Sequence, residues 1–285
     1  MENYYNLVAG IDEAGRGPLF GPVVACAVIF NKDFDISDIT DSKKISKNKR
    51  EKIYQKIISQ DIDYGIGIVS NETIDTINIL NATKKAMLLS INNLKNTPQK
   101  LLIDGNQLLD TKIEQEAIVK GDQKIAEISA ASIIAKVSRD KIVDSYDKVF
   151  PMYNLSKHKG YGTKHHVDTL NKYGPTSIHR KTFRPVLEIN ENSMADYESC
   201  DKVQYAMRLI KNGYCIKYFD KAEDVAIIHE DKGFVVYSLF VKNQNYEVES
   251  SLINEIKEKD SILKRRLDVI YINTGMVKVI KSFKI

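Results

Sequence analysis

The sequence has few of the features that mark secreted, membrane-bound or disulfide-rich proteins. Its 285 residues include three cysteines, at positions 26, 200 and 215, and no tryptophan. So few and scattered cysteines exclude a disulfide framework or a thiolate metal site. Its longest apolar runs, such as residues 23–30, are too short to span a bilayer, and residues 1–6 do not resemble a signal peptide. We therefore expect a protein of the reducing cytoplasm that does not associate with membranes.

The charge is unevenly distributed along the chain. Residues 1–190 hold 27 Lys and Arg against 23 Asp and Glu, whereas residues 191–285 hold 15 of each. The basic excess is greatest in residues 151–190, where the only acidic side chains are Asp168 and Glu188. A local basic segment of this kind suits a polyanionic partner, although a solvated basic face would have the same composition.

Apolar runs that alternate with longer periodic segments predict an α/β fold with a mixed sheet. Two early runs, close in sequence, read as an antiparallel hairpin, and the later runs alternate with helices. The expected strands cover residues 7–12, 23–30, 64–69, 101–105 and 117–122, and the expected helices cover residues 47–59, 71–94 and 125–146. Ser46 is the expected N-cap of the first helix.

A polar stretch without periodicity, residues 188–200, indicates a linker between two domains. We expect a first domain over residues 1–190 and a small α/β domain over residues 200–285. The second domain is predicted to contain helices at 203–211 and 246–263, and strands at 214–218, 225–228, 234–241, 267–272 and 276–280.

Four carboxylates, Asp12, Glu13, Asp104 and Asp122, follow or end apolar strand-like runs. Strand ends at one edge of an α/β sheet meet at one crevice, so we expect these side chains to converge. Hard oxygen donors of this kind suit Mg²⁺ or Mn²⁺, and two such ions can promote in-line displacement at phosphorus. The simpler interpretation is a solvated acidic pair at 12–13 and, for Asp122, a helix cap.

A Gly-Arg-Gly turn, Gly15-Arg16-Gly17, comes directly after the acidic pair and its following alanine. Glycines let a backbone approach a ligand closely, and backbone amides and a guanidinium both suit a phosphate. A phosphate site next to a metal site points to metal-assisted phosphodiester chemistry.

Six motifs in the same order make residues 1–187 resemble bacterial ribonuclease HII. They are GIDEAGRGPL at 10–19, DSKK at 41–44, IDGN at 103–106, KGD at 120–122, the run 128–140 and HKGYGTKH at 158–165. The resemblance implies a ribonuclease H-like fold: a mixed sheet flanked by helices.

The activity implied by this resemblance is an endoribonuclease that cleaves the RNA strand of RNA–DNA hybrids. It also implies incision at single ribonucleotides embedded in duplex DNA, as in ribonucleotide excision repair and DNA replication, leaving 3′-hydroxyl and 5′-phosphate ends. Asp12, Glu13, Asp104 and Asp122 match the family's catalytic carboxylates, which bind Mn²⁺ or Mg²⁺. The alternatives are a hybrid-binding module that holds a structural ion without turnover, and another two-metal nuclease of the same fold, such as a DNA resolvase.

Substrate contacts follow from the same resemblance. Residues 15–17 match the turn that senses the ribose 2′-hydroxyl, the one group that separates RNA from DNA at a single nucleotide. Tyr161 matches a tyrosine that packs against the sugar at the RNA–DNA junction, and Lys43 and Lys164 are expected phosphate contacts. Phe20 departs from the family pattern, which has a small residue there, and could alter substrate preference.

The C-terminal segment loosely resembles a restriction-endonuclease-like family through RLIKNGY at 208–214, DVAI at 224–227, VK at 241–242 and RLDVI at 266–270. That family places a metal-binding Glu two residues before the lysine, where this chain has Phe240. Because phenylalanine cannot bind a metal ion, we expect a degenerate module. Its zero net charge favours a protein partner over a nucleic acid.

Overall fold

The computed structural model describes residues 7–31, 46–60, 62–189, 194–222, 225–231, 234–241, 252, 256, 264–273 and 276–284. The chain forms two compact units: one comprises residues 1–140 and 178–188, and the other comprises residues 141–177 and 189–285. This grouping places residues 141–177 with the C-terminal part of the chain, so the division expected at residues 190–200 stays a prediction.

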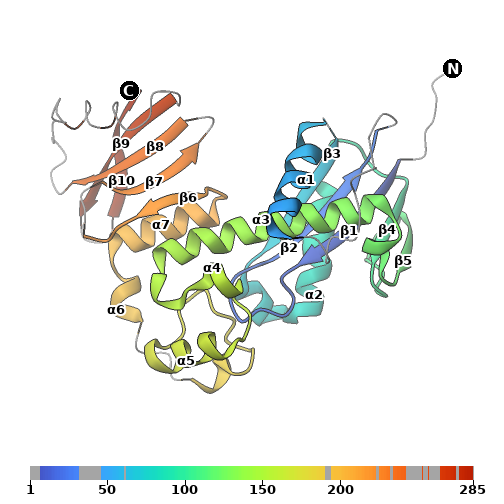
Figure 1. The fold of residues 1–285 in the computed structure, drawn as a ribbon, viewed down its shortest axis with the longest axis horizontal. Helices are drawn as coiled ribbons and strands as arrows, with labels where there is room; N and C mark the ends of the chain where they lie inside the picture. The colour runs from blue at the N-terminus through green and yellow to red at the C-terminus, as the bar shows by residue number, and fades with distance from the viewer. Residues whose placement is uncertain are drawn as a thin grey trace. The chain divides into compact units, whose positions relative to one another are not determined.

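The first unit is built on a five-stranded sheet in the order β3-β2-β1-β4-β5 (Figure 1). The strands are β1 (Val8–Ala14), β2 (Val23–Ile29), β3 (Asp63–Val69), β4 (Lys100–Asp104) and β5 (Glu114–Ile118). The pairs β1–β2 and β2–β3 are antiparallel, and the pairs β1–β4 and β4–β5 are parallel. The early hairpin and the mixed sheet predicted from the sequence are therefore confirmed.

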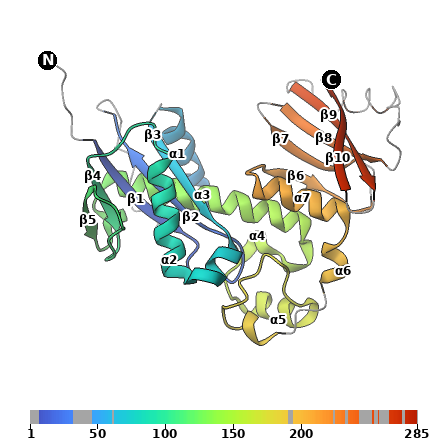
Figure 2. The same cartoon turned by 180° about the vertical axis from the view of Figure 1, so that it is seen from behind.

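Helices cover both faces of this sheet. The helix α2 (Asn71–Asn92) lies on one face, in front of the strands in Figure 2, and α1 (Lys47–Ser59) and α3 (Ala126–Val149) pack on the other. Two short 3₁₀ turns, η1 (Gly121–Gln123) and η3 (Val186–Glu188), complete the unit.

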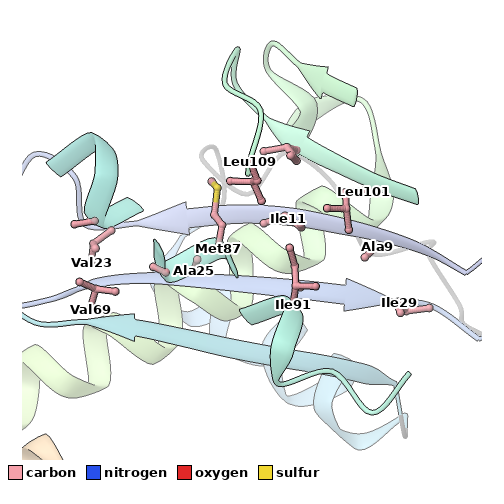
Figure 3. Close-up of a cluster of buried hydrophobic side chains, with 14 of the residues drawn as sticks. Ala9, Ile11, Val23, Ala25, Ile29, Val69, Met87, Ile91, Leu101 and Leu109 are labelled. Carbon is pink, nitrogen blue, oxygen red and sulfur yellow. The ribbon is translucent and has the colours of Figure 1, made fainter. Parts of the chain in front are cut away.

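The core on the α2 face is a cluster of apolar side chains from the strands β1 to β4 and the helix, shown in Figure 3. It includes Ala9 and Ile11 of β1, Leu101 and Ile103 of β4, and Met87 of α2. Since side chains alternate along a strand, Gly10, Asp12 and Asp104 face α3 instead. The sheet thus directs Asp12 and Asp104 toward the opposite helix layer.

Local sequence signals explain the helix ends. Ser46 caps α1 by accepting a hydrogen bond from the Lys49 amide, as the sequence predicted, and Ser70 caps α2 in the same way through Thr73. The helix α2 is kinked at Asn78, whose φ of 63° is left-handed. The helix expected over residues 71–94 is therefore present with a break at Asn78, a residue type that adopts the left-handed conformation more readily than most.

The second unit has helices and a separate five-stranded sheet. Its helical elements are the C-terminal part of α3, η2 (Pro151–Tyr153), α4 (Leu155–His158), α5 (Lys164–Tyr173), α6 (Ala195–Glu198) and α7 (Asp201–Lys211). The sheet has the order β10-β9-β8-β7-β6 and comprises β6 (Ile216–Phe219), β7 (Val225–Asp231), β8 (Phe234–Val241), β9 (Lys264–Asn273) and β10 (Met276–Lys284). Only β8 and β9 are parallel among its pairs.

This second sheet confirms the small C-terminal α/β part expected from the sequence. Most of the expected helix at 246–263 lies outside the described residues. Among the helices of the described residues, none is long and apolar enough to cross a membrane.

Candidate active site

Asp12 and Asp104 occupy neighbouring parallel strands at the same level of the sheet. The register pairs Ile11 with Ile103, so the next residues, Asp12 and Asp104, stand side by side on the face toward α3. Asp104 ends β4, whereas β1 continues to Ala14. Asp12 and Glu13 therefore lie within the strand, two residues further inside it than the sequence predicted.

Asp12 is buried, and its environment raises the pKa of its carboxyl well above the usual range. Burial is the largest cause, followed by the nearby charges of Glu13 and Asp104, and a hydrogen bond with the Ser132 side chain opposes both. The Glu13 amide also donates a 2.7 Å bond to Asp12 Oδ1. A cation close to this carboxylate would offset both the cost of burying its charge and the repulsion from its acidic neighbours.

Glu13 is half-buried and has a raised pKa, again mainly because of burial. Its Oε1 lies 3.4 Å from Nη1 of Arg16, whose positive charge partly offsets that effect. Arg16 itself is exposed. The acidic pair and the Gly-Arg-Gly turn are thus in direct electrostatic contact.

Asp122 does not end a strand, which corrects the placement expected from the sequence. The strand β5 stops at Ile118, and Asp122 lies four residues later, buried in the 3₁₀ turn η1 before α3. The chain reverses at Lys120, whose φ of 57° is left-handed. Gly121 then donates a 2.7 Å bond from its amide to Asp104 Oδ1. This bond ties the turn that carries Asp122 to the end of β4.

The donor chemistry of these four carboxylates fits a hard divalent cation, and burial, with repulsion between neighbouring carboxylates as a further cause, raises the pKa values of Asp12 and Glu13. Within the part of the chain that the structure describes, no three His, Cys, Asp or Glu side chains form a ready-made metal-binding group. All four residues fit Mg²⁺ or Mn²⁺ by donor type, and Asp12 and Asp104 also fit by their adjacent positions on the sheet.

Two buried arginines fasten the loop over residues 15–22, which contains the Gly-Arg-Gly turn. Arg180 donates four hydrogen bonds to carbonyl oxygens of this loop, and Arg139 donates two. Arg16 and Gly17 are nevertheless exposed at the surface. The turn is therefore rigidly held on one side and open on the other.

Phe20 is a core residue of this loop rather than a surface feature near a substrate. Its side chain is fully buried, and its ring packs edge-on against His179 at a centroid distance of 4.9 Å. The two residues also form an isolated antiparallel bridge. The large side chain at position 20, where the family pattern has a small residue, consequently affects how the loop is anchored.

Tyr161 and Lys164 belong to the second compact unit, and Lys43 lies outside the described residues. Tyr161 is 46% exposed although its backbone is well fixed. The His166 ring bonds the Tyr161 carbonyl at 3.0 Å, and the Tyr161 amide donates to the His158 carbonyl at 2.9 Å. Lys164 begins α5 and is exposed.

Sequence reasoning missed Arg139, Arg180 and Ser132. A signal existed for two of them, because Ile128, Ser132 and Arg139 recur at helical spacing on one stripe of α3 and all three are buried. A serine and an arginine on an otherwise apolar helix stripe indicate that polar groups of the neighbouring elements need hydrogen-bond partners there. Arg180 lies in an irregular segment, where periodicity carries no information.

The family model described as Ribonuclease HII matches residues 9–186. This chain belongs to the ribonuclease HII family. It is 56% identical over 179 residues to ribonuclease HII of Acetivibrio thermocellus, covering 63% of this chain and 70% of that protein. Ribonuclease HII of Francisella tularensis is 52% identical over 180 residues, covering 63% of this chain and 96% of that protein. The chain is therefore a type 2 ribonuclease H, an endoribonuclease that acts on RNA–DNA hybrids.

Solved structures agree with this assignment. The ribonuclease H2 of Pyrococcus horikoshii OT3 superposes with a TM-score of 0.53 at 28% identity, covering 64% of this chain and 95% of that one. The ribonuclease HII chain in a PCNA complex from Archaeoglobus fulgidus has a TM-score of 0.54 at 24% identity, covering 62% of this chain and 95% of that one, and supports the fold. The ribonuclease H-like fold predicted from the motifs is confirmed.

The family match ends at residue 186, so it does not test the C-terminal resemblance. Phe240 is buried in the second sheet, and its ring packs edge-on against Tyr205 of α7 at 5.6 Å. Lys242 and Asp224 of the resembling stretches lie outside the described residues. Phe240 therefore contributes to the core of this unit, while the degenerate nuclease module and its protein partner stay predictions.

Proposed function

We propose that this ribonuclease HII incises duplex DNA at single embedded ribonucleotides, in addition to cleaving the RNA strand of hybrids, by two-metal-ion hydrolysis. The products are a 3′-hydroxyl and a 5′-phosphate. The observation that carries the proposal is the pairing of Asp12 and Asp104 on adjacent parallel strands, beside an exposed turn suited to reading a sugar.

Asp12, Glu13, Asp104 and Asp122 would hold Mg²⁺ or Mn²⁺. Such ions, when bound, activate a water and stabilise the leaving oxygen of an in-line displacement. The carboxylates supply the hard oxygen donors, and the burial of Asp12 and Glu13 beside other carboxylates favours a cation there. Ser132 and the Glu13 amide orient the Asp12 carboxylate, and the Gly121 amide orients that of Asp104.

Arg16 is placed to contact a phosphate near the acidic pair, because its guanidinium is exposed and lies against Glu13. The amides of the same turn are placed to read a ribose 2′-hydroxyl. Recognition of one hydroxyl is sufficient to select a single ribonucleotide in an otherwise deoxyribose strand. Tyr161 would pack against the sugar at the junction, and Lys43 and Lys164 would contact phosphates.

The decisive experiment uses an end-labelled DNA duplex that contains one ribonucleotide. The full chain is incubated with this duplex in Mg²⁺, in Mn²⁺ or in EDTA, and the products are resolved on a denaturing gel. We expect one nick at the ribonucleotide in either metal, a nick end that a DNA polymerase can extend, and no product in EDTA.

Two control duplexes define the specificity. The same sequence without the ribonucleotide should stay intact, and a full RNA–DNA hybrid should be cut at several positions. Cleavage of the hybrid without a nick in the single-ribonucleotide duplex would contradict the proposed incision. Cutting of the all-DNA control would instead favour a DNA resolvase.

A further inference from the structure

We propose that Arg180 is a positioning residue for ribose recognition, because its buried guanidinium sets the direction of the amides of Arg16 and Gly17. The inference rests on the proposed function, in which this turn reads a 2′-hydroxyl. Arg180 lies 163 to 165 positions after the three residues of the turn, Gly15-Arg16-Gly17, whose geometry it fixes.

Arg180 is fully buried, and its guanidinium contacts the loop over residues 15–22 and the Phe183 ring. Its planar fork reaches four carbonyl oxygens at once. The distances are 2.6 Å from Nη2 to Gly15, 2.9 Å and 2.8 Å from Nη1 to Arg16 and Pro18, and 3.0 Å from Nε to Gly21.

These carbonyl contacts determine where the amides point. In a planar trans peptide, the C=O and the N–H point in opposite directions. The peptide that joins Gly15 to Arg16 directs its oxygen at Arg180, so the Arg16 amide points away from it. The peptide that joins Arg16 to Gly17 also directs its oxygen at Arg180, so the Gly17 amide points away from the guanidinium as well. Arg16 and Gly17 are exposed on the side away from Arg180, so we infer that their two successive amides form a pair of adjacent donors for an oxygen ligand.

Arg139 supports the same loop from α3. It donates to the carbonyls of Phe20 at 2.9 Å and Pro22 at 3.1 Å. Gly15 has a φ of +100°, and a Cβ built on it would lie 2.1 Å from Arg139 Nε. The loop backbone therefore rests directly on this guanidinium, which only a glycine permits.

The segment that carries Arg180 is itself held by α2. Asp75 accepts hydrogen bonds from the Lys181 amide at 2.9 Å and from the Thr182 amide and hydroxyl at 3.0 Å and 2.7 Å. Asn71 donates a further bond to the His179 carbonyl at 3.3 Å. Arg180 is thus preorganised before any substrate arrives, and Asp75 offers a milder way to loosen it.

Lysine cannot reproduce this arrangement. Its ammonium keeps the charge but has three donors on one atom at the end of a flexible stem, whereas the guanidinium has five donors in a fixed plane. Arg180→Lys should therefore preserve a buried cation while releasing the carbonyls of Gly15 and Arg16. The direction of the two amides would then no longer be fixed.

The test measures binding discrimination in an Asp104→Asn background, where Mg²⁺ can be present without cleavage. The dissociation constants of a duplex with one ribonucleotide and of the same all-DNA duplex are compared by fluorescence anisotropy. The background protein should prefer the ribonucleotide duplex. Adding Arg180→Lys should reduce that preference by roughly five-fold or more, the equivalent of one or two lost hydrogen bonds, with unchanged affinity for all-DNA duplex.

Lys181→Gln is the matched control, because this exposed neighbour lies on the same segment, and it should leave the preference unchanged. Equal weakening on both duplexes would show a merely structural role and overturn the proposal. If Arg180→Lys shows no cooperative melting, Asp75→Asn takes its place in the experiment. We then expect a smaller loss of preference for the ribonucleotide duplex. An unchanged preference in Asp75→Asn would overturn the inference. A background protein that binds both duplexes equally would instead refute ribose recognition, and thereby the proposed function on which the inference rests.

Discussion

The amide of Gly121 donates a 2.7 Å hydrogen bond to Oδ1 of Asp104, across 17 positions of sequence. The bond fixes one carboxylate oxygen and also fastens the turn that carries Asp122. A Cβ on Gly121 would lie 2.6 Å from Ile128 of α3, so the turn is packed against that helix as well. Two of the four acidic residues are therefore positioned by one short structural unit.

Asp104→Asn should abolish cleavage while hybrid binding survives. The amide oxygen of Asn can still accept the Gly121 bond, so the fold is preserved, but the negative charge needed for a divalent cation is lost. We expect the rate on an RNA–DNA hybrid to fall by more than about 100-fold, and Asp12→Asn to behave alike. Single-turnover cleavage and anisotropy measurements give the two quantities.

Asp110→Asn provides the control for this experiment, because Asp110 is an exposed carboxylate shortly after β4. It should retain wild-type cleavage. Full activity in either Asp12→Asn or Asp104→Asn would refute the assignment of these carboxylates as metal ligands.

The sequence predicted β1 to β4 to within about two residues because their apolar runs are continuous and are bounded by turn residues, whereas β5, whose sequence is EQEAI, lies three to four residues before the expected 117–122. It predicted Asp12 and Asp104 at one edge of the sheet, and the structure adds that their strands, β1 and β4, are neighbours. It misplaced Asp122, because β5 ends at Ile118 and the chain continues through a left-handed Lys120 into a 3₁₀ turn, and no propensity rule marks a lysine for that conformation.

The support around the site could not be predicted in the same way. Arg180 contacts a loop more than 150 positions away, and the bonds form only once the tertiary fold exists. The close approach of α3 to β1 at Gly10 is likewise a tertiary feature. A glycine in a strand is compatible with a bulge, a bend or a close contact, and the sequence does not distinguish among them.

Gly10→Ala should destabilise the first unit. A Cβ at this position would lie 2.3 Å from the Glu127 carbonyl carbon and 2.4 Å from the Ile128 nitrogen, both backbone atoms of α3. Because a helix backbone cannot rotate away as a side chain can, we expect the free energy of unfolding to fall by about 1–3 kcal/mol. Urea denaturation followed by circular dichroism measures the change.

Gly213→Ala is a useful comparison, since a Cβ there meets no atom within 4 Å and the only cost is its φ of +89°. That cost should be about 1 kcal/mol. If Gly10→Ala proves no more destabilising than Gly213→Ala, the helix and strand are not in the tight contact described.

Tyr161→Ala should reduce incision at a single embedded ribonucleotide more than cleavage of an all-RNA strand. The backbone of Tyr161 is fixed by His158 and His166, but its side chain is exposed and available to a sugar. An all-RNA strand offers many sites in many registers, whereas a single ribonucleotide offers one junction. The ratio of kcat/KM on the two substrates measures the effect.

The comparison variant for this experiment is Tyr161→Phe. If the ring packs against the sugar, the phenylalanine variant should stay close to wild type on both substrates. Equal losses on the two substrates in Tyr161→Ala would contradict the junction role. Thermal melting should be nearly unchanged in both variants, because the side chain lies at the surface.

His166 should make the protein less stable as the pH falls from about 6.5 to about 4. The ring is fully buried, stacks on His158 at 4.5 Å and bonds the Tyr161 carbonyl, and burial lowers its pKa to about 4. Below the unfolded value of about 6.5, the unfolded chain binds the proton more readily, so stability declines until the folded pKa is reached and then levels off. The full difference corresponds to about 3 kcal/mol.

The measurement compares unfolding free energies at pH 7 and pH 4 in wild type, His166→Asn and His165→Asn. Asparagine at 166 keeps a donor for the Tyr161 carbonyl but does not titrate, so its acid destabilisation should be smaller than that of wild type by about 3 kcal/mol. His165 is the exposed neighbour, and its substitution should leave the wild-type pH dependence in place. Groups that lie away from the cluster of His158, His165 and His166 contribute equally to all three proteins and cancel in the difference. Parallel pH curves for wild type and His166→Asn would show that the buried ring does not stay neutral in the folded protein.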